Sequence, residues 1–208
     1  MKKNRQTTLI KGVCGRLEAR HNLSELDAST VIRLVVLSHP HPLFGGTMNN
    51  KVVTTMERAF QSLGYATVAY NFRGVGQSDG EYDEGVGETD DLLSVLDWVR
   101  SRHTVEEVIL AGFSFGSYVS LRALPQTGAN RICTVAPPIG LYDFSALDKV
   151  DVPWSCIQGG RDEVVESEEV LSWVTKPGQC ADLYWRAGAS HFFHGELVWL
   201  KKVILSIY

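Results

Sequence analysis

The chain has 208 residues, of which 44% are hydrophobic, 10% aromatic and 21% charged. This composition is typical of a folded globular protein and excludes disordered and collagen-like classes. The formal net charge is -4, and the Lys and Arg residues are scattered rather than clustered, so the chain lacks the basic patch of a nucleic-acid-binding protein. We therefore expect a small ligand of low charge and no nucleic-acid partner.

The N-terminal and cysteine patterns give no sign of export, membrane insertion or metal binding. The basic start is followed only by Leu9 and Ile10 before Lys11, which is too short an apolar run for a signal peptide. The strongest apolar run, Val31 to Leu37, is far below the roughly 20 residues of a membrane span. Four cysteines lie far apart without a C-x-x-C spacing, namely Cys14, Cys133, Cys156 and Cys180. These features predict a cytoplasmic protein with reduced thiols, no membrane contact and no metal.

Taken in chain order, the first element expected is an antiparallel hairpin at the sheet edge over Leu9 to Leu17, interrupted by glycines. Short apolar runs then predict parallel strands buried on both faces. These runs are Val31 to Leu37, Tyr65 to Asn71, Glu107 to Ala111, Arg131 to Ala136, Pro153 to Gln158, and Asp182 to Arg186.

Amphipathic patterns between these runs predict crossover helices. Their expected positions are Val52 to Leu63, Leu92 to Val99 after the acidic stretch Glu88 to Asp91, Phe115 to Leu124, Ser167 to Trp173, and Glu196 to Ile207. The alternation of strands and helices indicates an α/β fold with a mostly parallel central sheet and helices on both faces. No repeat or long linker divides the chain, so we expect one domain over residues 1–208.

The segment Gly112-Phe113-Ser114-Phe115-Gly116 follows a predicted strand and opens a predicted helix. This is G-x-S-x-G in a strand-turn-helix setting, where larger side chains at Gly112 or Gly116 would collide across the tight turn. A glycine-rich connection with a serine N-cap is the alternative, but the chain has neither the dinucleotide nor the P-loop fingerprint. The pattern therefore favours Ser114 as a nucleophile.

A serine nucleophile needs a base, and the base needs an orienting carboxylate. Of six histidines, His191 and His194 lie directly after the last predicted strand, and His191 is preferred. Asp162 lies after the strand that ends at Gln158, with Asp143 as the fallback acid. The order Ser, Asp, His is that of a nucleophile-elbow hydrolase.

These segments give the chain a resemblance over nearly its whole length to the α/β-hydrolase superfamily, and to its small lidless bacterial members. The resemblance also rests on the segments His39 to Lys51 and Asn71 to Ser78. It implies an α/β-hydrolase fold without a cap domain, because only Pro137 to Asp151 is available where a lid is commonly inserted.

The resemblance also implies an oxyanion hole of two backbone amides, one of them from Phe115. The other should come from the loop after the first long parallel strand. Proline carries no N–H, which leaves His41, Leu43 or Phe44, and we choose Leu43. Phe44 and Phe192 are expected to contact substrate. His39 and His41 are expected to fix this loop by hydrogen bonds rather than to bind a metal, because the pattern H-x-H alone is only weak evidence for a metal site.

The predicted function is hydrolysis of small acyl esters by a serine esterase, through an acyl-enzyme formed on Ser114 with His191 as base and Asp162 as orienting acid. No cofactor is expected. A thioesterase or amidase with the same triad is an alternative, as is a non-catalytic binding or scaffold protein on this fold. Asn71, Arg73 and Ser78 lie outside the triad, and the last two are expected to pin the glycine-rich turn.

Overall fold

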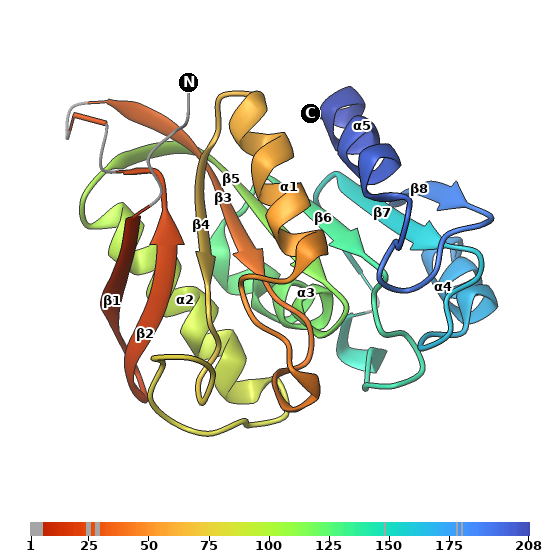
Figure 1. Cartoon of the computed structure of the whole chain (residues 1–208), viewed down its shortest axis with the longest axis horizontal. Helices are drawn as coiled ribbons and strands as arrows, with labels where there is room; N and C mark the ends of the chain where they lie inside the picture. Colours follow the sequence, from red (N-terminus) through yellow and green to blue (C-terminus); the bar gives the residue numbers. More distant parts are fainter. Residues whose placement is uncertain (1–5, 24–25, 28–29, 148, 178, 180) are drawn as a thin grey trace.

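The computed structural model describes residues 6–23, 26–27, 30–147, 149–177, 179 and 181–208. Its strands form an eight-stranded sheet in the order β1-β2-β4-β3-β5-β6-β7-β8 (Figure 1). The strands are β1 (Gln6–Gly12), β2 (Gly15–His21), β3 (Val31–Ser38), β4 (Ala66–Tyr70), β5 (Thr104–Phe113), β6 (Arg131–Val135), β7 (Trp154–Gly159) and β8 (Ala181–Arg186). The helices are α1 (Lys51–Ser62), α2 (Val86–Arg100), α3 (Phe115–Thr127), α4 (Ser167–Val174) and α5 (Leu197–Ile207), with short 3-10 turns η2 (Pro42–Phe44) and η3 (Ser145–Leu147).

The predicted hairpin is confirmed at the edge of the sheet. β1 pairs antiparallel with β2, and β2 pairs antiparallel with β4, whereas every pairing from β4 to β8 is parallel. The α/β fold with a mostly parallel sheet is therefore as predicted. Because parallel strands need crossover connections, each of the later strands is reached through a helix or a long loop.

Successive strand residues point to opposite faces, so each strand contributes to two hydrophobic cores. In β3, for example, Val35 and Leu37 pack with α1 and α5, whereas Leu34 and Val36 belong to the core shared with α2, α3 and α4. Figure 1 shows these two layers of helices on either side of the sheet. Burial on both faces explains why the central strands are almost continuously apolar.

Most element boundaries differ from the predictions by one to several residues, and the starts of β5 and α2 show a clear physical cause. β5 begins at Thr104 rather than Glu107, and its first residues are half-exposed, so their polar character hid the strand. α2 begins at Val86, because the Glu88 carboxylate accepts hydrogen bonds from the amides of Gly85 and Asp83 and so caps the helix earlier.

The loop ends of β3, β5, β7 and β8 meet along the carboxyl edge of the parallel strands, where open α/β sheets bind their ligands. Between β6 and β7 the described residues hold only the short turn η3, so no inserted domain covers this edge. No helix in the described part of the chain has both the length and the apolarity needed to cross a bilayer.

Candidate active site

Ser114 stands at the tight turn between β5 and α3. Its backbone has φ 52° and ψ -122°, a left-handed conformation that is strained for a residue with a side chain. A Cβ on Gly112 would collide with the backbone of Gly116, and a Cβ on Gly116 would collide with the carbonyl oxygens of Ser38 and His39. The two glycines are therefore required for the turn that presents the serine hydroxyl.

His191 lies between this serine and a carboxylate. Its Nε2 is 3.1 Å from Ser114 Oγ, and its Nδ1 is 2.9 Å from Asp162 Oδ2 and 3.0 Å from Oδ1. The ionised carboxylate can only accept, so Nδ1 carries the proton and Nε2 accepts from the serine hydroxyl. His191 is almost fully buried, at 2% exposure. The structure thus brings together the three residues expected from the order of the motifs.

The surroundings of Asp162 favour its ionised form. Burial raises the pKa of this carboxyl, but the hydrogen bond from His191 and two from backbone amides outweigh it, so the pKa lies below its ordinary value. The two amides belong to Val164 and Val165 and donate to Oδ1 at 2.9 and 2.8 Å. Asp143, the fallback acid, is exposed and accepts a hydrogen bond from the Ser145 amide instead.

Two supporting residues were not expected from the sequence. Gln158, fully buried at the end of β7, donates from Nε2 to Asp162 Oδ2 at 3.1 Å. Glu163 accepts the backbone N–H of His191 at 3.0 Å and so ties the two loops together. The sequence offered two signals for them. Gln158 is a polar residue near the end of an otherwise apolar strand, and Glu163 is a second acid directly after Asp162.

A cavity of about 260 Å³ opens beside Ser114 and His191. Its remaining lining is mostly apolar or backbone and comprises Pro40, His41, Phe44, Gly45, Gly46, Asn50, Val164 and Phe192. Phe44 is 86% exposed and Phe192 is 37% exposed, so both form open walls at the mouth. Both residues expected to contact substrate therefore line the cavity, whereas Phe115 and Phe193 are buried in the core.

The hydrogen bonds within the loop after β3 show which of its amides are free to act as the expected oxyanion donor. The amide of Leu43 already donates to His41 Nδ1 at 3.2 Å, and its side chain is 68% exposed and absent from the cavity wall. The amide of Phe44 donates to the His41 carbonyl at 3.2 Å. Among the described residues neither the His41 amide nor the Phe115 amide has a hydrogen-bond acceptor. Because the Leu43 N–H is used within the η2 turn, the structure favours the His41 amide over the expected Leu43 amide as the free donor of this loop.

His39 fixes the loop after β3 by two hydrogen bonds, as expected. Its Nδ1 is 2.6 Å from the Pro40 carbonyl, which can only accept, so Nε2 is the acceptor for the Phe72 amide at 3.0 Å. The ring is completely buried, and burial lowers the pKa of His39 to about 3. His39 is therefore neutral near pH 7, and its acceptor nitrogen is already occupied by the Phe72 N–H, which leaves none to act as a base.

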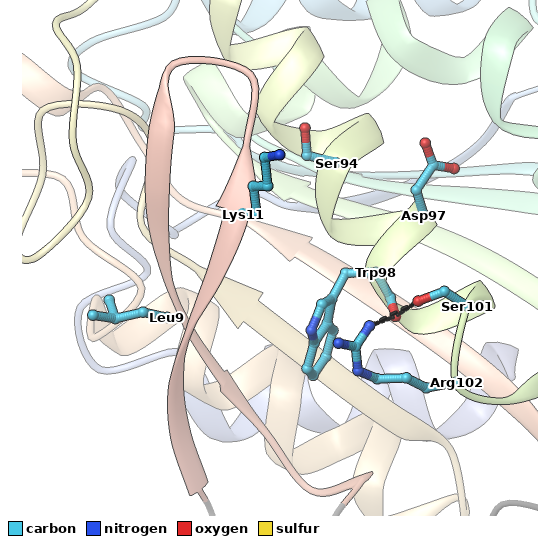
Figure 2. A pocket seen from close by; sticks show the side chains of 7 residues that line it. All are labelled: Leu9, Lys11, Ser94, Asp97, Trp98, Ser101 and Arg102. Atoms are coloured by element: carbon cyan, nitrogen blue, oxygen red, sulfur yellow. Dashed lines mark hydrogen bonds between the residues drawn. The ribbon is translucent and has the colours of Figure 1, made fainter.

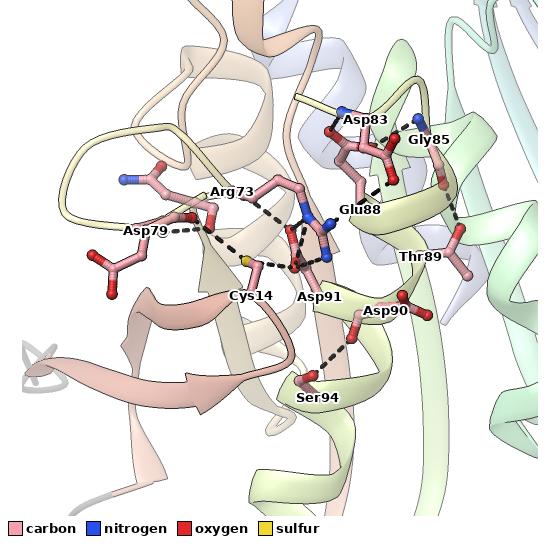
Figure 3. A network of polar contacts seen from close by, with 12 residues as sticks. Cys14, Arg73, Asp79, Asp83, Gly85, Glu88, Thr89, Asp90, Asp91 and Ser94 are labelled. Carbon is pink, nitrogen blue, oxygen red and sulfur yellow. Dashed lines mark hydrogen bonds and ion pairs between the residues drawn. The ribbon is translucent and has the colours of Figure 1, made fainter. Parts of the chain in front are cut away.

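The glycine-rich loop after β4 is held by a buried ion pair, as Figure 3 shows. Arg73 Nη2 lies 2.8 Å from Asp91 Oδ1, and the Arg73 amide donates to Asp91 Oδ2 at 2.9 Å. Ser78 Oγ donates to the Asn71 carbonyl at 2.7 Å. Cys14 contacts the same network, with Sγ 3.8 Å from Asp91 Oδ1. These contacts agree with the structural role expected for Arg73 and Ser78.

A larger hollow, of about 420 Å³, lies between β1 and α2, and neither Ser114 nor His191 lines it. Figure 2 shows it lined by Trp98 and Arg102, with an Arg102 Nη1 to Ser101 Oγ hydrogen bond of 2.7 Å. It contains no histidine or cysteine, and its shape is open. Despite its size, it offers no paired nucleophile and base.

The three described cysteines take no part in the site. Burial raises the pKa of Cys133 and of Cys156 to about 12, which keeps both as unreactive thiols. Cys14 is also a free thiol, and Cys180 lies outside the described residues. Within the described chain no group of three or more His, Cys, Asp or Glu side chains is placed to hold a metal ion.

The nucleophile turn, the sheet order and the uncovered carboxyl edge together define an α/β-hydrolase. A family model described as alpha/beta hydrolase fold matches residues 43–171, and the chain belongs to this family.

Similar proteins match nearly the whole chain. A structure described as an alpha-beta serine hydrolase homologue from Coxiella burnetii is 41% identical, with a TM-score of 0.88 over 97% of this chain and 96% of that one. XC6422 from Xanthomonas campestris, described as an a/b serine hydrolase without lid, is 38% identical, with a TM-score of 0.89 over 99% and 94%. An uncharacterized protein, RP471, from Rickettsia prowazekii (strain Madrid E) is 33% identical over 94% of this chain and 85% of its own length.

Proposed function

We propose that this hydrolase is a carboxylesterase acting on small, uncharged acyl esters. The observation that carries the proposal is the continuous hydrogen-bonded chain Ser114, His191, Asp162, which opens into an uncovered and mostly apolar cavity. A cavity of about 260 Å³ suits a short acyl group better than a long one. Its lining contains no Lys, Arg, Asp or Glu, so a charged acyl group would find no partner there.

In this mechanism Ser114 attacks the ester carbonyl while His191 Nε2 takes its proton. His191 then donates that proton to the departing alcohol, and water repeats the two steps on the acyl-enzyme. Asp162 stays ionised and stabilises the imidazolium, in keeping with its lowered pKa. The unbonded amides of His41 and Phe115 are the proposed donors to the developing oxyanion.

The proposal needs no cofactor, and the substrate is a small molecule. Thioesters and amides share the same chemistry and are the alternative substrate classes. A cytoplasmic location is part of the proposal, supported by the free thiols of Cys14, Cys133 and Cys156.

The experiment is labelling by a fluorophosphonate together with hydrolysis of p-nitrophenyl acetate. Ser114→Ala and His191→Ala should each lose labelling and reduce turnover by about 10⁴-fold or more, because triad residues act as a unit. His194→Ala is the matched control, since this ring stacks on Phe192 outside the triad, and it should keep its label. A folded unmodified protein that neither labels nor hydrolyses any ester, thioester or amide would refute an enzymatic function and favour a scaffold.

A further inference from the structure

The imidazole of His41 is a group that the proposed mechanism does not use. We propose that it is a positioning residue that fixes the two oxyanion amides relative to each other, an inference that rests on the proposed function. It acts through two contacts, one with the η2 turn and one with the side chain of Phe115.

The first contact is a side-chain cap on η2. His41 Nδ1 accepts the N–H of Leu43 at 3.2 Å, and the His41 carbonyl accepts the amides of Phe44 and Gly46 at 3.2 and 3.0 Å. These bonds hold the residue by its side chain and its carbonyl. A Cβ on Gly46 would collide with the carbonyl oxygens of Pro40 and His41, so the loop closes tightly around this peptide. The His41 N–H has no acceptor among the described residues, and His41 lines the cavity beside Ser114.

The second contact is with the residue that carries the other amide. The His41 ring centroid lies 5.1 Å from that of Phe115, 4.8 Å from Tyr82 and 6.4 Å from Tyr142. Phe115 is buried at 1% exposure, and its ring also packs on Tyr82 at 5.7 Å. Rings at these separations are in attractive contact. The imidazole therefore bridges the loop after β3 and the first residue of α3, from which the two amides come.

The cap also sets the form of the imidazole. Because Nδ1 accepts from a backbone N–H, its proton must lie on Nε2 and the ring must be neutral. Burial lowers the pKa of His41, which agrees with this neutral form. Two separable properties follow, an acceptor at Nδ1 and a flat ring, and different substitutions remove them one at a time.

The test uses three variants of the full chain with p-nitrophenyl acetate. His41→Phe keeps a ring but has no acceptor, His41→Asn keeps a capping acceptor but has no ring, and His41→Leu has neither. Removing an oxyanion donor outright costs about 10²–10³-fold in kcat, so we expect about 100-fold for His41→Leu and about 10-fold for each of the others. KM should change by no more than about twofold. His103→Asn, at the opposite end of β5, is the control and should keep the unmodified rate.

Amide hydrogen exchange of Leu43 gives a readout that does not depend on activity. The amide should be protected in the unmodified protein and in His41→Asn, and should exchange at least tenfold faster in His41→Phe and His41→Leu. Folded variants with an unchanged kcat, or with a raised KM and an intact kcat, would overturn the positioning role. Loss of both labelling and turnover in the unmodified protein would overturn the proposed function, and the positioning role with it.

Discussion

Lowering the pH should destabilise the protein through His39, a buried ring at the start of the loop after β3. Its pKa is about 3 in the folded protein and about 6.5 in the unfolded chain. Between these values the unfolded chain binds more protons, so the stabilisation is fully present above pH 6.5 and is lost as the pH falls towards 3. Each pH unit in this window is worth up to about 1.4 kcal/mol, and the integral from pH 7 to pH 5 is about 2 kcal/mol.

The matched variant is His39→Gln, whose side-chain oxygen can still accept the Phe72 amide. Urea unfolding of both proteins at pH 7, 6 and 5 gives the free energy of unfolding at each pH. The variant should be less stable at pH 7, because it loses the bond to the Pro40 carbonyl, but its stability should fall by about 2 kcal/mol less on going to pH 5. Equal pH dependence in the two proteins would show that His39 titrates normally and would refute the reasoning.

Three further predictions concern the turn, the ion pair and the cavity. Gly116→Ala should lower stability by about 1 to 3 kcal/mol or prevent folding, whereas Gly188→Ala, where a Cβ would meet nothing within 4 Å, should leave the melting temperature unchanged. Arg73→Met leaves the buried carboxylate of Asp91 without its guanidinium partner and should cost about 3 to 5 kcal/mol in chemical denaturation, while hydrolytic activity per folded molecule is retained. Phe44→Ala should raise KM for apolar esters by about threefold and leave kcat within about twofold, because Phe44 lines the cavity and, in the proposed function, contacts substrate without touching the reacting atoms. A fall in kcat alone would contradict that role.

The fold was predictable where one physical signal dominated. β3 and β7 are buried over nearly their whole lengths, so continuous apolar runs identified them. The start of β5 was missed because Thr104 to Glu106 lie partly in water and include the polar side chains of Thr104 and Glu106. The order of the strands across the sheet was not predicted, because periodicity alone does not order parallel strands.

The candidate site was also predictable only in part. The proximity of Ser114, His191 and Asp162 was predictable, because loops that follow parallel strands meet at one edge of the sheet. Which amide of the loop after β3 stays free was not predictable, because it depends on which N–H groups form hydrogen bonds within the η2 turn. Eliminating prolines left Leu43 open, and only the hydrogen bond to His41 Nδ1 removes it.

The proposed catalytic base sits on the loop that follows β8, which pairs with β7 and has no fully buried residue. A strand at the rim of a sheet with a half-exposed surface opens locally at a lower free energy than the central strands. Fraying of this rim would withdraw His191 while the nucleophile turn on β5 stays folded. Activity would then be lost reversibly at a lower temperature or denaturant concentration than the one that unfolds the sheet. An activity assay would therefore measure the local stability of the β8 edge.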